Sequence, residues 1–296
     1  MIQYRYSLDR SSKKFICPSC GKKTFVKYVD NTSNSYLDNQ YGRCDRENKC
    51  KAHFRPYGNN KIDLLQTLET KPKPSYHSLE LVERSVLDKS KNNFIEFLIQ
   101  NFPVNDVNKA ITNYFVGTSR RHQHATIFWQ IDKDKNVHAG KIMLYDKETG
   151  KRKKSAKGIS YIDWVHKIKT IGQFNLEQCL FGLHLTNETS EKCVAIVESE
   201  KTAVIMSIFK PHYIWLATGS KHGFKEEMLQ PIKEFKIVAF PDKGEYLDWK
   251  KTALTLNAMG FNIVVDEWLN ETEYKNGTDL ADIYINEICK GIYCLI

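Results

Sequence analysis

The stretch VAIVESEKTAVIMSIF, residues 194–209, decides the fold class of this chain. It opens with four apolar residues, becomes acidic at Glu198 and Glu200, and continues as a second, longer apolar run. A short apolar run, a polar junction and a longer apolar segment are typical of a buried strand followed directly by a helix. The stretch therefore predicts a strand with Glu198 at its carboxyl end, where a helix begins.

The chain after residue 190 repeats this alternation of short apolar runs and helical segments. The apolar runs are CVAIVE, YIWLATG, KIVAFPD and FNIVVDEW, and helical patterns such as YLDWKKTALTLNAMG lie between them. Strands that alternate with helices of about 10–15 residues indicate βαβ units, whose parallel sheet is buried on both faces. Residues 190–296 are therefore predicted to form an α/β domain with a Rossmann-like, mainly parallel sheet.

The segment before this domain has a different pattern. LELVERSVLDKSKNNFIEFLIQNF and PVNDVNKAITNYF predict two short helices, and ATIFWQIDKDKNVHAGKIMLYDKETGKRKK predicts two strands joined by polar turns. We expect residues 79–189 to form a small basic α+β subdomain. The proline- and lysine-rich TKPKPSYHS, residues 70–78, predicts a linker over 59–78, which leaves 1–58 as a separate N-terminal domain.

The charge of the chain favours polyanionic partners. Its net charge is +9, and between Lys141 and Lys169 nine basic residues occur against three acidic ones. A membrane helix needs about 18 uninterrupted apolar residues, and no run of this sequence approaches that length. The first residues do not resemble a signal peptide. We therefore expect a soluble cytoplasmic protein that binds nucleic acid and has no membrane partner.

Four of the eight cysteines lie in the first 50 residues, with the spacing Cys17-x2-Cys20 and Cys44-x5-Cys50. Four thiolates satisfy a tetrahedral Zn²⁺ ion, and this spacing predicts a structural zinc ribbon. His53 could replace Cys50 as the fourth ligand. The alternative to a metal site is four core cysteines in a small domain. The other cysteines show no ligand spacing and are expected to be buried small hydrophobes: Cys179, Cys193, Cys289 and Cys294.

Three predicted strands of the C-terminal domain end in residues suited to a ligand site, namely Glu198, Gly219 and Asp242. Ligands of parallel α/β sheets collect at the carboxyl ends of the strands, so these residues are expected to converge. Asp279 and Asp282 follow the fourth strand in GTDLAD. Together the carboxylates predict a Mg²⁺ site, because hard cations prefer oxygen ligands and share them with phosphates. The alternative is that each acid only caps a helix or lies in a solvated loop.

These segments resemble the TOPRIM domain that bacterial and phage primases, topoisomerases and related nucleases share. The resemblance covers about residues 190–290 and rests on VESEKTA, ATGS, FPDKG and TDLADIY in this order. It implies that Glu198 acts as a general acid or base. It also implies that catalytic Mg²⁺ or Mn²⁺ is held by Asp242, with Asp279 as a further acid of the metal site.

One departure from the family pattern concerns its Asp-x-Asp motif. The second Asp would lie at position 244, where this chain has Gly244. Asp248 or Asp282 could supply the missing charge, or the site could bind metal weakly, or catalysis could be lost. This position therefore bears on the choice between an active enzyme and a non-catalytic protein.

The order of the predicted domains resembles that of bacterial-type DNA primases, in which a zinc ribbon, a basic α+β subdomain and a TOPRIM domain follow one another. YFVGTSRRHQHATIFWQIDKDKNVHAGKIMLYD also resembles the subdomain that precedes TOPRIM in primase-like proteins of phages and mobile elements. The resemblance implies a nucleotidyltransferase of DNA replication that makes primers from nucleotides on single-stranded DNA, with a replicative helicase as a candidate partner. A metal-dependent nuclease and a non-catalytic zinc-ribbon DNA-binding protein are the alternatives.

Several basic residues are candidates for nucleic-acid contacts, although a run of charges is often only a solvated turn. Candidates for phosphate contacts at the acidic site, together with the strand-end glycine, are Lys201, Gly219, Lys221 and Lys243. Candidates for holding the template backbone are Arg120, Arg121, Lys141, Lys151, Arg152, Lys153 and Lys154. Trp129, Tyr161 and Trp164 could stack bases, with core packing as the alternative for each.

Overall fold

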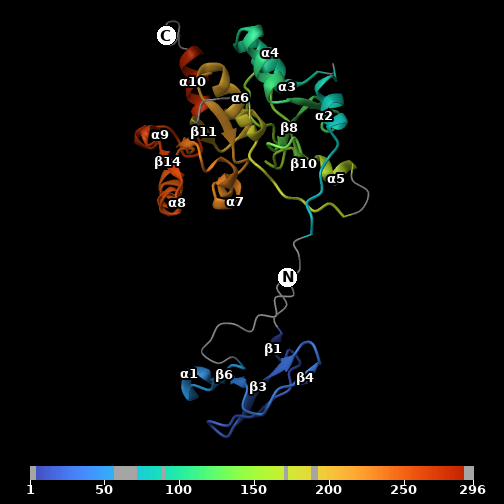
Figure 1. Ribbon diagram of the computed structural model, residues 1–296, viewed down its shortest axis with the longest axis vertical. Coiled ribbons are helices and arrows are strands. Elements are labelled where there is room, and N and C mark those ends of the chain that lie inside the picture. The colour runs from blue at the N-terminus through green and yellow to red at the C-terminus, as the bar shows by residue number, and fades with distance from the viewer. Residues whose placement is uncertain (1–4, 57–71, 89–90, 170–172, 188–192, 290–296) are drawn as a thin grey trace. The chain divides into compact units, whose positions relative to one another are not determined.

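The structure is a computed structural model that describes residues 5–56, 72–88, 91–169, 173–187 and 193–289 (Figure 1). The chain forms two compact units, Met1–Lys73 and Pro74–Ile296, and each is described by itself. The boundary between the units falls within the predicted linker, most of which lies outside the described residues. The predicted division at residues 189 and 190 lies inside the second unit and stays a prediction. None of the described helices is long and apolar enough to cross a membrane.

The first unit is a small antiparallel sheet around β3 (Lys23–Asp30). Its strands follow the order β1-β3-β5-β6, and β2 and β4 also pair with β3. The other elements are β1 (Tyr6–Leu8), β2 (Phe15–Ile16), β4 (Ser35–Tyr36), β5 (Gly42–Cys44), α1 (Glu47–Cys50) and β6 (His53–Phe54). Among the described residues its core cluster consists of Cys17, Phe25, Cys44 and Ala52, and Val26 and Tyr28 are the other buried hydrophobic residues. So small a core is typical of a domain that needs a metal to stay folded.

The second unit begins with helices and a four-stranded antiparallel sheet in the order β10-β9-β8-β7. The strands are β7 (Gly117–Ser119), β8 (Ala125–Ile131), β9 (Val137–Met143) and β10 (Ile162–Trp164), and the helices are α2 (Leu79–Val86), α3 (Asn93–Asn101), α4 (Val104–Asn113) and α5 (Val165–Lys169). Every residue of β8 and β9 is buried, so both faces of this sheet are covered. The first of the two predicted helices is divided into α2 and α3, because Asn92 caps a new helix by accepting hydrogen bonds from the backbone of Phe94 and Ile95.

The predicted parallel sheet is confirmed. Its strands are β11 (Cys193–Val197), β12 (Ile214–Ala217), β13 (Lys236–Ala239) and β14 (Asn262–Val265), and all pairs in the order β12-β11-β13-β14 are parallel. The helices and 3-10 turns of this part are η1 (Leu183–Asn187), α6 (Glu200–Phe209), η2 (Lys221–Gly223), α7 (Glu226–Leu229), η3 (Gln230–Ile232), α8 (Tyr246–Ala258), α9 (Trp268–Glu271) and α10 (Leu280–Cys289). The second unit is thus a mixed α/β structure with two sheets.

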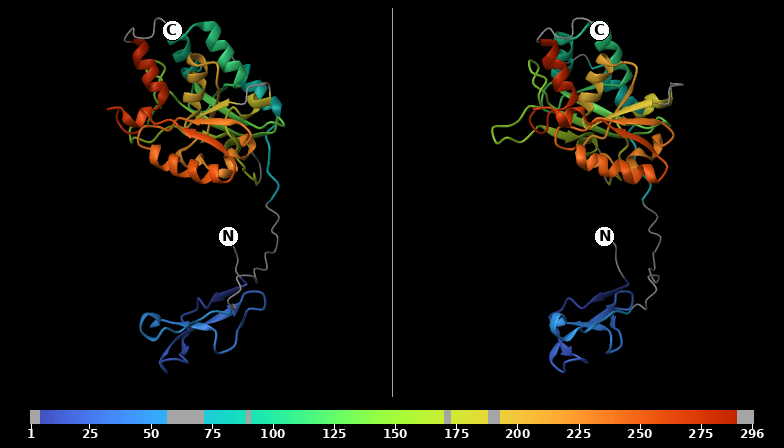
Figure 2. Two further views of the ribbon diagram at one scale, coloured as in Figure 1. Left: turned by 60° about the vertical axis from the view of Figure 1, so that its left-hand side comes forward. Right: turned by 90° about the vertical axis from the view of Figure 1, so that its left-hand side faces the viewer.

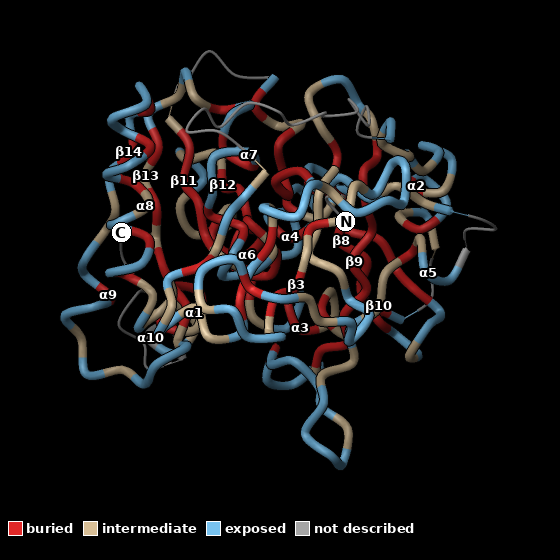
Figure 3. Tube along the Cα trace, turned by 90° about the horizontal axis from the view of Figure 1, so that it is seen from below, coloured by how far each residue is buried: buried red, intermediate tan, exposed pale blue. Residues whose placement is uncertain are grey.

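Helices cover both faces of the parallel sheet. Ala195 and Val197 of β11 face a core that α6 and α10 complete, whereas Val194 and Ile196 face a core with α7 and α8. This alternation is the period of two expected for a strand buried on both sides. Figure 2 shows α8, in orange, and α10, in red, on opposite sides of the sheet, and Figure 3 shows buried residues concentrated in the strands.

The two sheets of the second unit share one hydrophobic core. Phe128 of β8 packs edge-on against Phe181, with ring centroids 5.5 Å apart, and Phe181 forms a β-bridge with Ala217 of β12. The Tyr114 hydroxyl donates a hydrogen bond to the carbonyl of Trp215 at 2.8 Å. The inner face of the antiparallel sheet therefore lies against the parallel sheet, and residues of β9 reach the carboxyl ends of its strands.

Candidate functional site

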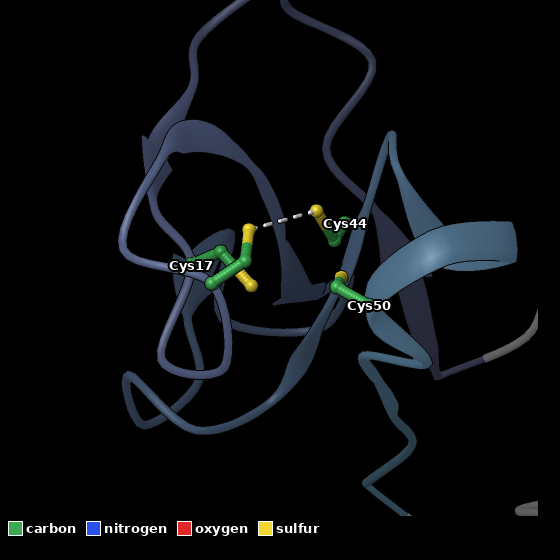
Figure 4. Close-up of side chains that lie close together, drawn as sticks. Cys17, Cys44 and Cys50 are labelled. Atoms are coloured by element: carbon green, nitrogen blue, oxygen red, sulfur yellow. Dashed lines mark hydrogen bonds between the residues drawn. The ribbon is translucent and has the colours of Figure 1, made fainter.

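The four N-terminal cysteines converge in the first unit. Cys17 and Cys20 lie in the turn between β2 and β3, Cys44 ends β5, and Cys50 ends α1. Their sulfur atoms all lie within 4.8 Å of one another, and Figure 4 shows Cys17, Cys44 and Cys50 pointing toward a common centre. Thiolates that bind a tetrahedral zinc at about 2.3 Å are roughly 3.8 Å apart. The sulfurs of Cys20 and Cys44 are 3.9 Å apart, which fits this arrangement.

The surroundings of the cysteine cluster also suit a metal site. The Sγ atom of Cys44 is 3.2 Å from the Thr24 hydroxyl and accepts a hydrogen bond from the Arg46 backbone amide at 3.4 Å. The Thr24 contact is the main cause that lowers the pKa of Cys44 to about 7. Hydrogen bonds of this kind stabilise a thiolate, which is the form that binds zinc. The donor set and its hydrogen bonds fit structural Zn²⁺.

His53 is not part of the cysteine cluster. Its Nε2 atom is 3.0 Å from the Tyr28 hydroxyl, and its Nδ1 atom is 3.0 Å from a Glu47 carboxylate oxygen. Because both ring nitrogens have protein partners and Cys50 lies within the cluster, Cys50 is the fourth ligand that the structure supports. The open choice between His53 and Cys50 is thereby answered in favour of Cys50.

Removal of one cysteine ligand tests this site. Cys44→Ser is expected to reduce bound zinc from about one ion per chain to nearly none and to unfold the first unit, because its core is too small to fold without the metal. Elemental analysis measures the zinc, and nuclear magnetic resonance of the first-unit amides measures the folding. His53→Gln is the matched control and should keep its zinc. Zinc retained in Cys44→Ser would contradict the assignment.

The remaining cysteines are separate from this cluster. Cys179 is buried, as predicted, whereas Cys193 at the start of β11 is only partly buried. Cys289 and Cys294 lie outside the described side chains. No third ligand gathers around either described thiol within the part of the chain that the structure describes.

Glu198 lies directly after β11, at the carboxyl edge of the parallel sheet. The side chain that caps α6 is Ser199, whose hydroxyl accepts a hydrogen bond from the Thr202 backbone amide at 3.2 Å. Glu198 is therefore not placed there as a helix cap. Its side chain is partly buried, and burial is the main cause that raises the pKa of its carboxyl group, with Glu245 raising it further.

Asp242 follows β13 and belongs to the same acidic group. Burial, together with the charges of Asp279 and Glu198, raises the pKa of Asp242 to about 8. The negative charge of one carboxylate disfavours ionisation of its neighbours, and a cation between them stabilises the ionised forms. Among the described residues, no three carboxylates of this acidic group have oxygen atoms that all lie within 4.8 Å of one another. The acids therefore do not surround a metal position on their own. Mg²⁺ commonly takes only one or two protein carboxylates and shares substrate phosphates, which this open arrangement allows.

Asp279 has a second role at the start of α10. One carboxylate oxygen accepts a hydrogen bond from the Asp282 backbone amide at 2.8 Å, and the other accepts one from the Thr202 hydroxyl at 2.9 Å. Lys201 lies 3.4 Å from Asp279 and donates to Asp282 at 2.8 Å. Burial lowers the pKa of Lys201, but the two acids raise it by more, so this lysine stays charged. These contacts join α6 to α10. The phosphate contact of Lys201 and the metal contact of Asp282 stay predictions.

Gly244 adopts a backbone conformation that an acid would not adopt easily. Its φ is +96°, and a Cβ atom there would lie 3.2 Å from the Asn276 side chain. The backbone of Lys243 bonds to Thr278 and to Gly277, which holds this turn against the segment before α10. The missing second acid thus coincides with a left-handed turn. Asp279 is the acid whose charge acts most on Asp242, whereas Asp248 is exposed on α8.

Restoring the acid tests this explanation. Gly244→Asp is expected to lower the free energy of unfolding of the second unit by about 1–2 kcal/mol, because a side chain is strained at this φ. Urea unfolding followed by tryptophan fluorescence measures it, since all five tryptophans lie in the second unit. Gly158→Asp, which has a φ of +77° but no neighbour within 4 Å, should lose less. A Gly244→Asp variant as stable as the wild type would contradict the strain.

Besides the buried Lys141 and Lys201, two predicted basic residues act on the acids of this edge, namely Arg152 and Lys221. Arg152 lowers the pKa of both Glu198 and Asp242, although burial and the neighbouring acids outweigh it, and Lys221 acts on Glu198 in the same way. Lys221 also donates to Glu245 at 2.9 Å. A pocket of about 550 Å³, a size suited to a small ligand, opens beside Lys221 and Glu245 and reaches Trp249 of α8. The sequence analysis did not identify Glu245 as a residue of the acidic edge. The one sequence signal for it is its position three residues after Asp242.

Other predicted phosphate and template residues have different surroundings. Lys243 donates to the carbonyls of Asn270 and Thr272 at 2.6 and 2.7 Å, beside the end of α9. Lys141 is buried and donates to Glu200 and to the carbonyl of Gly219, so it does not lie on the surface with the other candidates for template contact.

The remaining template candidates fall into two groups. Arg120 and Arg121 pair with Asp88 and Asp163 and line a pocket of about 970 Å³ over the outer face of the antiparallel sheet. The residues of the lysine run beside Arg152 are exposed: Lys151, Lys153 and Lys154. The structure thus brings Arg152, and not Arg120 or Arg121, to the acids.

The aromatic candidates for base stacking are not equally placed. Trp129 is fully buried in the core over the outer face of the antiparallel sheet, and its ring nitrogen donates to the Ser85 hydroxyl at 2.9 Å. Core packing, the alternative given for it, therefore holds. Trp164 and Tyr161 are partly buried and lie against His166 and His122.

Comparison with models of protein families shows two matches to this chain. Residues 92–243, just over half of its 296 residues, match a family described as a domain of unknown function (DUF6371). The chain therefore belongs to the DUF6371 family. Residues 4–63, which contain all four clustered cysteines, match a family described as a zinc beta-ribbon finger. The first unit is thus a zinc ribbon. No curated protein matches the chain.

Solved structures of primases are similar to the chain at low identity. The primase fragment of the bacteriophage T7 primase-helicase protein is 12% identical, with 95% of this chain and 98% of that one covered and a TM-score of 0.43. A DnaG catalytic core is 11% identical over 70% and 74%, with a TM-score of 0.46. The Aquifex aeolicus primase, with zinc-binding and RNA polymerase domains, is 12% identical over 96% and 78%, with a TM-score of 0.40. Likenesses at these values do not carry a function, which has to rest on the residues of this chain.

Proposed function

We propose that this protein is a DNA primase-like nucleotidyltransferase that makes short primers on single-stranded DNA at a TOPRIM-type site. The observation that carries the proposal is the acidic edge of the parallel sheet, where Glu198 and Asp242 follow the neighbouring parallel strands β11 and β13 and the charge of Arg152 acts on both. Phosphoryl chemistry on a polyanion needs this combination of metal-binding acids and phosphate-binding cations. The resemblance of VESEKTA, FPDKG and TDLADIY to TOPRIM segments supports the same function.

Each residue of the edge has a proposed role. Asp242 would hold Mg²⁺ or Mn²⁺, which when bound neutralises phosphate charge at the reacting centre. Glu198, raised in pKa by burial, would accept or return a proton as the primer hydroxyl attacks. Asp279 lies behind Asp242 and keeps α10 in place through its contacts with Thr202 and Asp282. Arg152 and Lys221 would contact the phosphates of the incoming nucleotide.

Exposed basic residues would hold the template strand. Lys153→Ser with Lys154→Ser is expected to lower the salt dependence of single-stranded DNA binding, because each lost phosphate contact reduces the log-log slope by about 0.7. Fluorescence anisotropy over a series of salt concentrations measures the slope. Lys109→Ser, an exposed lysine on α4, is the matched control and should leave the slope unchanged. Equal slopes in the double variant and the wild type would show that Lys153 and Lys154 do not contact the template.

One observation favours a second function. Gly244 takes the place of the second motif acid in a turn that disfavours an acid, which is what a non-catalytic zinc-ribbon DNA-binding protein would show. The nuclease alternative uses the same carboxylates and has no separate observation in its favour. A helicase partner and a phage or mobile-element origin stay predictions.

A product assay separates these functions. The full chain is incubated with single-stranded DNA, labelled nucleotides of both sugar types and Mg²⁺ or Mn²⁺, and the products are resolved by length. New labelled oligonucleotides support the primase, and shortening of the template supports the nuclease. Binding that is sensitive to salt, with neither product, supports the non-catalytic protein and overturns the proposal.

A further inference from the structure

A buried charged pair links the two sheets directly beneath the acidic edge. The Lys141 ammonium group, on β9, donates to both carboxylate oxygens of Glu200 at 3.1 Å and to the carbonyl of Gly219 at 2.7 Å. Lys141 is 7% exposed and Glu200 is 1% exposed. The three ammonium protons thus have three acceptors, drawn from two different strand ends of the parallel sheet.

We propose that Lys141 and Glu200 are positioning residues that fix the orientation of Glu198, and this inference rests on the proposed function. Glu200 begins α6 two residues after Glu198, so a fixed Glu200 limits the movement of the junction that carries Glu198. The backbone amide of Gly219 also donates to the Glu198 carbonyl at 2.9 Å. Lys141 therefore acts on Glu198 from both sides, through Glu200 and through Gly219.

The glycine at 219 is required by this close approach. Its φ is +77°, and a Cβ atom at this position would lie 3.1 Å from a carboxylate oxygen of Glu200. A side chain would therefore be strained by the backbone and would press on the pair at the same time. Glycine allows the β12 turn to pass directly over the Glu200 carboxylate, where Lys141 bonds to both.

The energetics of a buried pair favour a positioning role over a stabilising one. Removal of two charges from water offsets most of their attraction, and apolar residues of similar volume are often as stable. The same face of the antiparallel sheet carries Phe128 and Met143 in the shared core, so apolar residues would fit the pattern at 141. What an apolar pair cannot do is hold the Gly219 carbonyl and the first turn of α6 in a single geometry.

A second buried polar side chain lies next to the charged pair. Gln130 of β8 is 1% exposed, and neither polar atom of its amide has a hydrogen-bond partner among the described residues. Its nitrogen lies 3.6 Å from the point where a Cβ atom on Gly219 would be. The core beneath Gly219 is therefore polar, as expected beneath a functional site.

The test removes both charges and keeps the volume. The full chain is made as the double variant Lys141→Met with Glu200→Leu, and circular dichroism establishes that it is folded. We expect the rate of labelled primer synthesis at saturating nucleotide to fall about 100-fold, because misplacement of a reacting group by about 1 Å has an effect of this size. The KM for nucleotide should not change. Hydrogen exchange at the Gly219 amide should become faster, which is a readout independent of activity.

His138→Gln is the matched control, since His138 is a buried polar residue of the same strand that contacts Asp132 and the carbonyl of Glu177, away from Gly219. It should keep both the rate per folded molecule and the slow exchange. A folded double variant with the wild-type rate and wild-type exchange overturns the inference. If the double variant does not fold, Gly219→Ala disturbs the same contact from the other side. A wild-type rate of primer synthesis in that variant, with wild-type hydrogen exchange at the Ser220 amide, then overturns the inference.

The two failures can be told apart. If the wild type makes no primers, the proposed function has failed, and hydrogen exchange at the 219–220 turn alone decides the positioning inference. If the wild type makes primers and the folded double variant makes them equally well, the proposed function stands and the positioning inference has failed.

Discussion

Glu198→Gln is expected to lower the rate of primer synthesis by about 10²–10⁴-fold, the range typical for loss of a general acid or base. The substitution keeps the shape of the side chain and removes only its ability to carry charge and accept a proton. Burial and the charge of Glu245 already disfavour the charged form of Glu198, so the neutral amide should leave the second unit at least as stable as before. Initial rates and urea unfolding, followed by tryptophan fluorescence, measure the two effects separately.

Glu227→Gln is the control for this substitution. This variant has the same chemical change on an exposed face of α7, and it should keep the wild-type rate of primer synthesis. If Glu198→Gln also keeps the wild-type rate, Glu198 is not the proton-transfer group, and the acidic edge has another role. A loss of rate together with a large loss of stability would indicate instead that Glu198 supports the fold.

Lys141→Met alone is expected to lower the free energy of unfolding of the second unit by about 3–5 kcal/mol, the largest effect that we predict on the stability of this unit. The substitution leaves the Glu200 carboxylate buried without its cation, and it also removes the donor to the Gly219 carbonyl. Addition of Glu200→Leu should recover most of the loss, because the uncompensated charge is then gone. Urea unfolding of the wild type, both single variants and the double variant measures the coupling directly.

The matched control for this prediction is Lys221→Met. Lys221 donates to Glu245 at a similar distance of 2.9 Å, but its side chain is 48% exposed, so water replaces the lost partner and stability should change little. If Lys141→Met is as stable as Lys221→Met, the pair between Lys141 and Glu200 is not the buried link that the structure indicates.

The parallel sheet and its acidic edge could be predicted from local patterns. The four apolar runs after residue 190 are short, separated by helical segments and apolar on both faces, which is a signal contained within each run. Glu198 and Asp242 stand directly after two of these runs, so the topology of a parallel sheet is sufficient to bring them to one edge. The zinc ligands were equally accessible, because four cysteines in two pairs within 34 residues define a site by spacing alone.

The roles of the lysines could not be predicted in this way. Lys141 lies on β9 and Glu200 begins α6, 59 residues later, so their contact depends on how the antiparallel sheet packs against the parallel sheet and its helices. In sequence Lys141 is merely the first of nine basic residues. Lys243 lies next to Asp242 in the chain, yet its side chain bonds to the end of α9. A count of charges indicates that a segment is basic, but it does not distinguish a buried ion pair from a surface that binds phosphate.

Labelled-nucleotide incorporation on single-stranded DNA by the wild-type chain and by Asp242→Asn, side by side with Mg²⁺ and with Mn²⁺, tests the central claim most directly. We predict metal-dependent oligonucleotides of defined short length from the wild type and none from Asp242→Asn, while both proteins bind the template. Products from both proteins, or from neither, would contradict the assignment of the acidic edge as a metal-dependent nucleotidyl-transfer site.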